Sequence, residues 1–137
     1  MKTGFKTLGA YKISYELAMI IFNLTKAFPK EETYSLTDQV RRSSRSICVN
    51  FAEAYRKRLF IRHFVSKLTD CDAECSETQV WLELAKDCQY ITTSQYNEII
   101  LKYIDVGNLL GDMINNPEKY QEKPRSKNTV QVIPTPK

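Results

Sequence analysis

The stretch Leu36–Arg58 reads LTDQVRRSSRSICVNFAEAYRKR and predicts one long amphipathic helix. Apolar residues recur in it at spacings of three, four and seven, which is the period of a single helix face. Ser35 precedes the stretch as a candidate N-cap, and Asp38 places a negative charge in the first turn, where the helix dipole favours it. The apolar face consists of Leu36, Val40, Ile47, Phe51 and Ala54.

Three further segments, residues 8–28, 60–88 and 92–116, show the same helical period. The chain has four glycines and no Asn-Gly or Asp-Gly pair, so hairpins and strands have little support. The second and third helices join near Arg58 without Gly or Pro, which predicts a tight turn. Four helices with short connections predict an all-α fold, an up-down antiparallel four-helix bundle.

Local signals mark the ends of two of these helices. Proline disfavours helical geometry in the residue before it, so Phe28-Pro29 ends the first helix. Thr92 and Gln95 predict a capping box at the start of the fourth. The first helix also carries two adjacent apolar stripes, which is more than a lone bundle needs and indicates a second contact surface.

The length of 137 residues suits one domain, which can bury a core without a disulfide or a metal. The chain lacks a run of about 18 apolar residues, the length of a membrane-spanning helix, and its start lacks the features of a secretory signal. We therefore expect no membrane partner and a cytoplasmic location. Residues 1–116 are predicted to form the bundle domain. Residues 117–137 hold four of the five prolines and are predicted to form a flexible basic tail.

The residue types needed for a cofactor or for catalysis are scarce. His63 is the only histidine, whereas a di-iron bundle needs Glu-x-x-His motifs from two helices. Cys71 and Cys75 share a helix face, but without other ligands the cysteines are better explained as small buried hydrophobes with reduced thiols. Nucleophile motifs, phosphate-binding loops and dinucleotide fingerprints are absent from the sequence. We expect no cofactor, no metal and no enzymatic activity.

Charge is divided unevenly along the chain. Residues 1–68 hold 13 Lys/Arg and 5 Asp/Glu (net +8), whereas residues 69–116 hold 2 and 9 (net −7). A basic surface attracts anionic partners, and each phosphate contact adds to affinity by releasing counterions. The candidate nucleic-acid-binding residues are Arg41, Arg42, Arg45, Arg56, Lys57, Arg58 and Arg62.

Two interpretations of this basic set stay open. In the first, it binds phosphates, while Tyr55 and Phe60 offer rings on which bases can stack. In the second, the arginines pair with Asp38, Glu53 and the acidic third helix, and the cations near the end of the second helix only complement its dipole.

A polar stripe lies beside the apolar face of the second helix, because its members follow one another at spacings of seven, four and three. Such a stripe predicts buried, hydrogen-bonded side chains, above all Asn50 and Glu53, that fix the helix register. The alternative is a solvated face. The predicted structural polar network comprises Gln39, Ser46, Asn50, Glu53 and Glu77.

The segment Phe28–Arg58 resembles the central signature of a known family. In that signature an aromatic-Pro turn precedes Leu-x-x-Gln-x-x-Arg, followed by Ser-Ile-x-x-Asn-x-Ala-Glu and a basic end. A second match is ETQVWLELA at Glu77–Ala85, which resembles the third helix of the family. These are the 23S rRNA-intervening sequence proteins, bacterial four-helix bundles that include the accessory variability determinant of diversity-generating retroelements.

The resemblance implies a homopentamer without enzymatic activity. The retroelement member partners a reverse transcriptase and nucleic acid, so the implied partners are further copies of the chain, RNA or DNA, and a reverse transcriptase or another protein. The sequence thus favours a nucleic-acid-binding accessory protein. The alternatives are a protein–protein interaction scaffold with no nucleic-acid ligand and, less supported, a metal or redox bundle.

Overall fold

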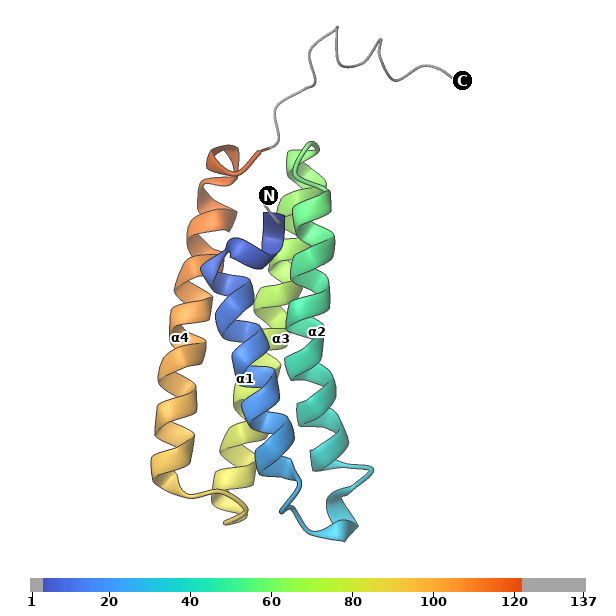
Figure 1. Ribbon diagram of the computed structural model, residues 1–137, viewed down its shortest axis with the longest axis vertical. Coiled ribbons are helices and arrows are strands. Elements are labelled where there is room, and N and C mark those ends of the chain that lie inside the picture. Colours follow the sequence, from blue (N-terminus) through green and yellow to red (C-terminus); the bar gives the residue numbers. More distant parts are fainter. Residues whose placement is uncertain (1–3, 122–137) are drawn as a thin grey trace, which may run out of the picture.

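The computed structural model describes residues 4–121, and these form four long helices and three short 3-10 helices (Figure 1). The predicted segments are confirmed, with each helix ending within three residues of its expected bounds. The long helices are α1 (Gly9–Thr25), α2 (Leu36–Arg56), α3 (Ile61–Asp87) and α4 (Thr93–Asn115). The 3-10 helices are η1 (Gly4–Thr7), η2 (Lys30–Glu32) and η3 (Pro117–Lys119).

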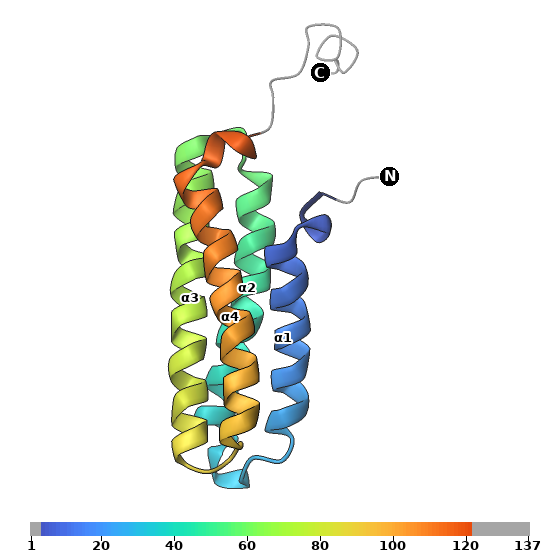
Figure 2. The same cartoon turned by 90° about the vertical axis from the view of Figure 1, so that its left-hand side faces the viewer.

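The four long helices run alternately up and down around one core, as Figures 1 and 2 show from two sides. Each helix packs against the next along the chain, and α1 also packs against α4. The predicted up-down four-helix bundle is therefore confirmed. Because α1 and α2 are neighbours, the basic part of the sequence forms one side of the bundle. Most of α3 and all of α4 form the acidic side.

The core lies where the apolar stripes of the four helices meet. All five apolar-face residues predicted for α2 are buried. On α1 the buried face takes Leu17 from one predicted stripe and Ala18 from the other, with Ile21 between them. Part of each stripe remains outside the core, and Tyr15 is exposed, as is the neighbouring Met19. Tyr103, Phe51 and Phe64 are the largest fully buried side chains.

The starts of α4 and α2 differ in how well the sequence predicted them. The capping box is confirmed, because the Thr92 hydroxyl accepts from the Gln95 N–H at 3.0 Å and the Gln95 side chain accepts from the Thr92 N–H at 2.9 Å. Ser35 precedes α2 but makes no capping bond. The Glu32 carboxylate instead accepts from the Leu36 N–H at 3.2 Å and from the Ser35 hydroxyl.

Glu32 also joins the two loops at this end of the bundle. Tyr90 lies just after α3, and its hydroxyl donates to the second carboxylate oxygen of Glu32 at 2.9 Å. The hydrogen bonds from Ser35, and then from Tyr90, lower the pKa of Glu32. The same contact with Glu32 raises the pKa of Tyr90 to about 12.

Glu32→Gln is expected to lower the thermal midpoint at neutral pH. A carboxyl with a lowered pKa stabilises the fold above its unfolded pKa, about 4.3, and this contribution is lost as the pH falls through the lower folded value. The midpoint difference from wild type should therefore be clear at pH 7 and shrink in strong acid, measured by circular dichroism. Glu31→Gln, at an exposed neighbour, is the matched control and should change little. An equal deficit at both pH values would contradict the role of the charge.

The folded part extends beyond the predicted domain boundary. The Tyr120 hydroxyl donates to Asp112 at 2.8 Å, and the Gln121 amide donates to the Leu59 carbonyl at 3.3 Å. The first five residues of the predicted tail are thus packed on the bundle, and the rest, residues 122–137, lie outside the described residues. None of the helices in residues 4–121 is long and apolar enough to cross a membrane.

Candidate nucleic-acid interface

The seven candidate basic residues form two groups rather than one patch. The central group is Arg41, Arg42 and Arg45 on α2. The corner group is Arg56, Lys57, Arg58 and Arg62, where α2 ends and α3 begins. At about 1.5 Å per helical residue, Arg41 and Arg56 are roughly 22 Å apart along the axis of α2.

Arg41 is used within the bundle. Its Nε donates to the Thr25 hydroxyl at 2.7 Å and its Nη2 to the Phe22 carbonyl at 3.4 Å. Its guanidinium also lies 4.8 Å from the centre of the Phe22 ring. These contacts place a cation at the C-terminal end of α1, where the helix dipole favours it.

The other two members of the central group also have partners in the bundle. Arg42 lies 2.6 Å from Glu77 and 3.9 Å from Glu74, both on α3. Arg45 lies 5.6 Å from the centre of the Phe22 ring, a weaker cation–π contact. The interpretation that the arginines pair with acidic α3 is therefore confirmed for Arg42. The pairing of an arginine with Glu53, which was also expected, is wrong, because the partner of Glu53 is Lys67 at 2.8 Å.

Within the corner group, Arg58 is tied to the fold. It stacks 3.6 Å from the centre of the Tyr55 ring and donates to the carbonyls of Tyr55 at 2.8 Å and Tyr120 at 3.4 Å. Tyr55 is covered from another side by Gly4, where an added Cβ would lie 2.9 Å from the ring. Gly4 also has a φ of +66°, so a side chain there would be strained as well as crowded. Tyr55 is therefore not an open stacking surface.

The remaining corner cations face solvent. Within residues 4–121, Arg56, Lys57 and Arg62 form no salt bridge and no side-chain hydrogen bond, and all three are exposed. Phe60 lies between them on the α2–α3 turn and is 60% exposed. Its ring meets the His63 ring edge-on at a centroid distance of 6.1 Å. Three available cations and one exposed ring thus share the corner.

The predicted polar network is not present in the single chain. Glu53 is exposed, not buried, and its pKa is lowered by the hydrogen bond from Lys67. Asn50 is only half-buried, and among the described residues its side chain has no hydrogen bond, nor do those of Gln39 and Ser46. Glu77 does bond, but to Arg42 and to the Trp81 indole at 3.1 Å. The stripe lies at the rim of the α2–α3 contact, where side chains reach solvent.

A different polar pair joins α2 and α3 in the core. Ser43 and Thr78 are fully buried and their hydroxyl oxygens lie 2.8 Å apart. The Thr78 hydroxyl also lies 2.8 Å from the Glu74 carbonyl, so both hydroxyls find partners. Ser43 fills the gap between Val40 and Ile47 in the apolar face of α2. That gap was the sequence signal for a buried polar residue.

Two of the four cysteines behave as predicted small core residues. Cys71 and Cys75 are buried, Cys48 is half-buried, and Cys88 is exposed. Burial raises the pKa of Cys71 to about 12 and those of Cys48 and Cys75 to about 11, so these thiols stay protonated at neutral pH. Across residues 4–121, no three His, Cys, Asp or Glu side chains gather in a way that could hold a metal ion.

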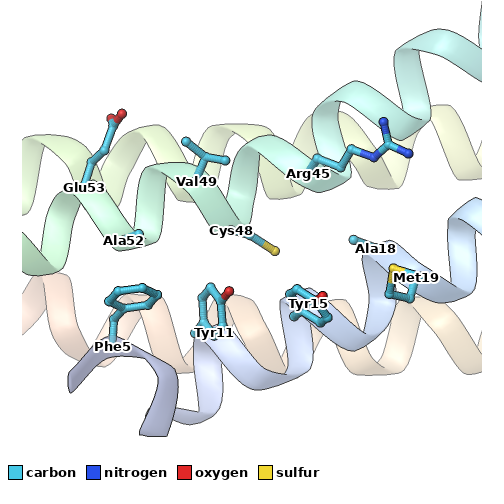
Figure 3. A pocket seen from close by; sticks show the side chains of 10 residues that line it. All are labelled: Phe5, Tyr11, Tyr15, Ala18, Met19, Arg45, Cys48, Val49, Ala52 and Glu53. Atoms are coloured by element: carbon cyan, nitrogen blue, oxygen red, sulfur yellow. The ribbon is translucent and has the colours of Figure 1, made fainter. Parts of the chain in front are cut away.

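An apolar groove runs between α1 and α2 on the basic side of the bundle (Figure 3). Its volume is about 490 Å³. Tyr15 and Met19 line it from α1, and Val49 from α2, with exposed fractions of 54%, 46% and 58%. The remaining lining residues are Phe5, Tyr11, Ala18, Arg45, Cys48, Ala52 and Glu53.

The fold and the surface define an all-α four-helix bundle with a basic corner and an uncovered apolar groove. The family model of the 23S rRNA-intervening sequence proteins matches residues 6–112, and the chain belongs to this family. A crystal structure of a protein of unknown function from the S23 ribosomal protein family of Bacteroides thetaiotaomicron is similar, with 33% identity and a TM-score of 0.69. The match covers 77% of this chain and 97% of that one. No curated protein matches.

Proposed function

We propose that this protein is a non-enzymatic, homo-oligomeric accessory protein that binds nucleic acid through its basic surface. The observation that supports it best is the set of three exposed cations, Arg56, Lys57 and Arg62, which form no salt bridge and no side-chain hydrogen bond within residues 4–121. Exposed cations near one another repel, and phosphates that bind between them remove this repulsion. With reduced thiols and no disulfide among the described residues, we place the protein in the cytoplasm.

Assembly into a ring of five copies is the second part of the proposal. A head-to-tail ring needs two different faces on each subunit. The groove between α1 and α2 is one exposed apolar face. On α4, Leu101 and Ile104 are exposed at 64% and 47% and form another. The basic α1–α2 side and the acidic α4 side are complementary in charge, which favours contact between the two faces of neighbouring copies.

Binding of labelled RNA and DNA by the full chain, followed by fluorescence anisotropy, tests the nucleic-acid part. Affinity is expected to fall steeply between low and physiological salt, because each phosphate contact releases counterions. Arg56→Glu with Arg62→Glu should abolish binding and leave the helical signal intact. Lys12→Glu with Lys102→Glu changes the net charge equally at exposed sites on α1 and α4 and should bind nearly as wild type. Equal losses in both double variants would leave only a general charge effect.

A protein–protein scaffold without a nucleic-acid ligand is the second candidate. The partners found for Arg41, Arg42 and Arg58 within the chain favour it, because these arginines are explained by the fold alone. Wild-type protein that assembles but binds neither RNA nor DNA at low salt would support the scaffold over the nucleic-acid-binding protein.

A further inference from the structure

We infer that the α2–α3 corner takes an unpaired stretch of nucleic acid, with Phe60 stacking on a base and Arg56, Lys57 and Arg62 binding the flanking phosphates. The inference rests on the proposed nucleic-acid binding and names its site and substrate class. Of the seven candidate basic residues, four are exposed and form no salt bridge or side-chain hydrogen bond within residues 4–121: Arg45, which lies against the Phe22 ring, and these three at the corner.

The position of Arg62 has no structural explanation. Arg56 and Lys57 lie at the C-terminal end of α2, where the helix dipole favours cations, so the fold alone accounts for them. Arg62 lies in the first turn of α3, where the dipole favours anions, and that turn contains no acidic residue. The positive charge of Arg62 is therefore unfavourable at the start of α3. A phosphate bound there would contact both the guanidinium and the free N–H groups of the helix end.

Phe60 is an exposed aromatic residue between Lys57 and Arg62 in the sequence, on the turn that joins α2 to α3. Its N–H donates to the Lys57 carbonyl at 3.0 Å, and its carbonyl accepts from the Phe64 N–H at 2.9 Å, so its backbone is fixed. Its ring is 60% exposed, whereas the neighbouring ring of Tyr55 is covered by Arg58. An exposed ring on a hydrogen-bonded backbone can stack on a base without ordering a flexible loop first.

The combination of ring and cations selects unpaired bases. In a duplex both faces of a base are already stacked, and exposing one costs a few kcal/mol of unstacking. An unpaired base has a free face, and stacking on aromatic side chains is tolerant of sequence. No element of the corner is shaped like a base-reading motif, so little sequence preference is expected.

The corner lies at the same end of the bundle as η1 and η3 (Figure 1). Lys6 in η1 is exposed, whereas Lys119 in η3 is paired with Asp112 at 3.2 Å. A strand that leaves the corner toward η1 therefore meets the further positive charge of Lys6.

The test compares a fluorescein-labelled oligouridylate with an RNA duplex of the same length, using the full chain and fluorescence anisotropy. Wild type should bind the single strand at least about tenfold more tightly. Phe60→Ala should weaken single-strand binding about tenfold, the effect of losing one stacked base, and leave duplex binding unchanged. Leu59→Ala removes an adjacent apolar side chain with 42% exposure and should change neither.

The outcomes separate this inference from the proposed function. If Phe60→Ala is silent and the duplex binds as well as the single strand, while Arg56→Glu with Arg62→Glu abolishes binding, the preference for unpaired bases is overturned and nucleic-acid binding stands. Polyphosphate, which has no bases, should displace the oligouridylate more readily from Phe60→Ala than from wild type, and equal competition in both would also overturn the stacking role of Phe60. If wild type binds neither probe, both proposals fall together.

Discussion

Tyr103→Ala is expected to lower the free energy of unfolding by about 3–5 kcal/mol, the usual cost of deleting a large aromatic side chain from a core. Tyr103 is fully buried in α4 and is the largest of the fully buried side chains. Its backbone carbonyl also accepts a weak hydrogen bond from the Cys75 thiol of α3 at 3.8 Å. Urea unfolding followed by circular dichroism measures the loss, at one protein concentration because assembly contributes to stability.

Tyr103→Phe is the matched control for this truncation. The Tyr103 hydroxyl is buried without a hydrogen-bond partner, and burial raises its pKa. Removing an unpaired buried hydroxyl relieves a desolvation cost of about 1–3 kcal/mol. We therefore expect Tyr103→Phe to be as stable as wild type or more stable. A loss comparable to that of Tyr103→Ala would show that the hydroxyl has a partner in solution and that the ring alone does not carry the effect.

Val49→Glu is expected to break the assembly. Val49 is 58% exposed in the apolar groove, and a carboxylate placed in a dry contact between copies would be desolvated without a partner. Light scattering should give wild type a mass near five times the 15.9 kDa of one chain. The variant should fall to the mass of one chain. Glu is a better helix former than Val, so α2 itself should remain intact.

Val80→Glu provides the comparison at a matched site. Val80 is 55% exposed and lies on α3, outside both the groove and the α4 face. The substitution adds the same charge and should leave the assembly whole. Dissociation by Val80→Glu but not by Val49→Glu would place the contact on α3. A wild-type protein that runs as a monomer would remove the assembly from the proposed function.

Local patterns explain why the helices could be predicted. A helix face requires apolar residues at fixed spacings, and those spacings are visible in the sequence before any partner is known. The capping box at Thr92 and Gln95 closes within four residues, so it too depends on nothing outside the segment. The predicted N-cap of α2 was wrong for the converse reason: the group that accepts from the start of α2 is Glu32, and its position depends on a residue outside the segment. Glu32 is set in place by Tyr90, which is distant in the sequence.

The polar residues of α2 illustrate the limit of spacing arguments. Ser43 and Asn50 are both small and polar and lie on the same helix, yet Ser43 is fully buried and Asn50 reaches the rim. The period places a residue on a face to within about one residue, whereas burial at the edge of that face depends on the tilt of the neighbouring helix. Thr78 on α3 hydrogen-bonds to Ser43 and not to Asn50, so the position of α3 determines which of the two polar residues is buried.

The sequence by itself determined the four helices, their order, the short connections and the division of charge between the two halves, because each of these depends on residues close together in the chain. Only the tertiary structure decided which cations are available. Arg41 is held by Thr25 and Phe22, Arg42 by Glu77, and Arg58 by Tyr55 and Tyr120, and most of these partners lie on other segments. Arg56, Lys57 and Arg62 are also cations, but they form no salt bridge and no side-chain hydrogen bond within residues 4–121. The physical reason is that the availability of a charge depends on its neighbours in space, which a helical period does not specify.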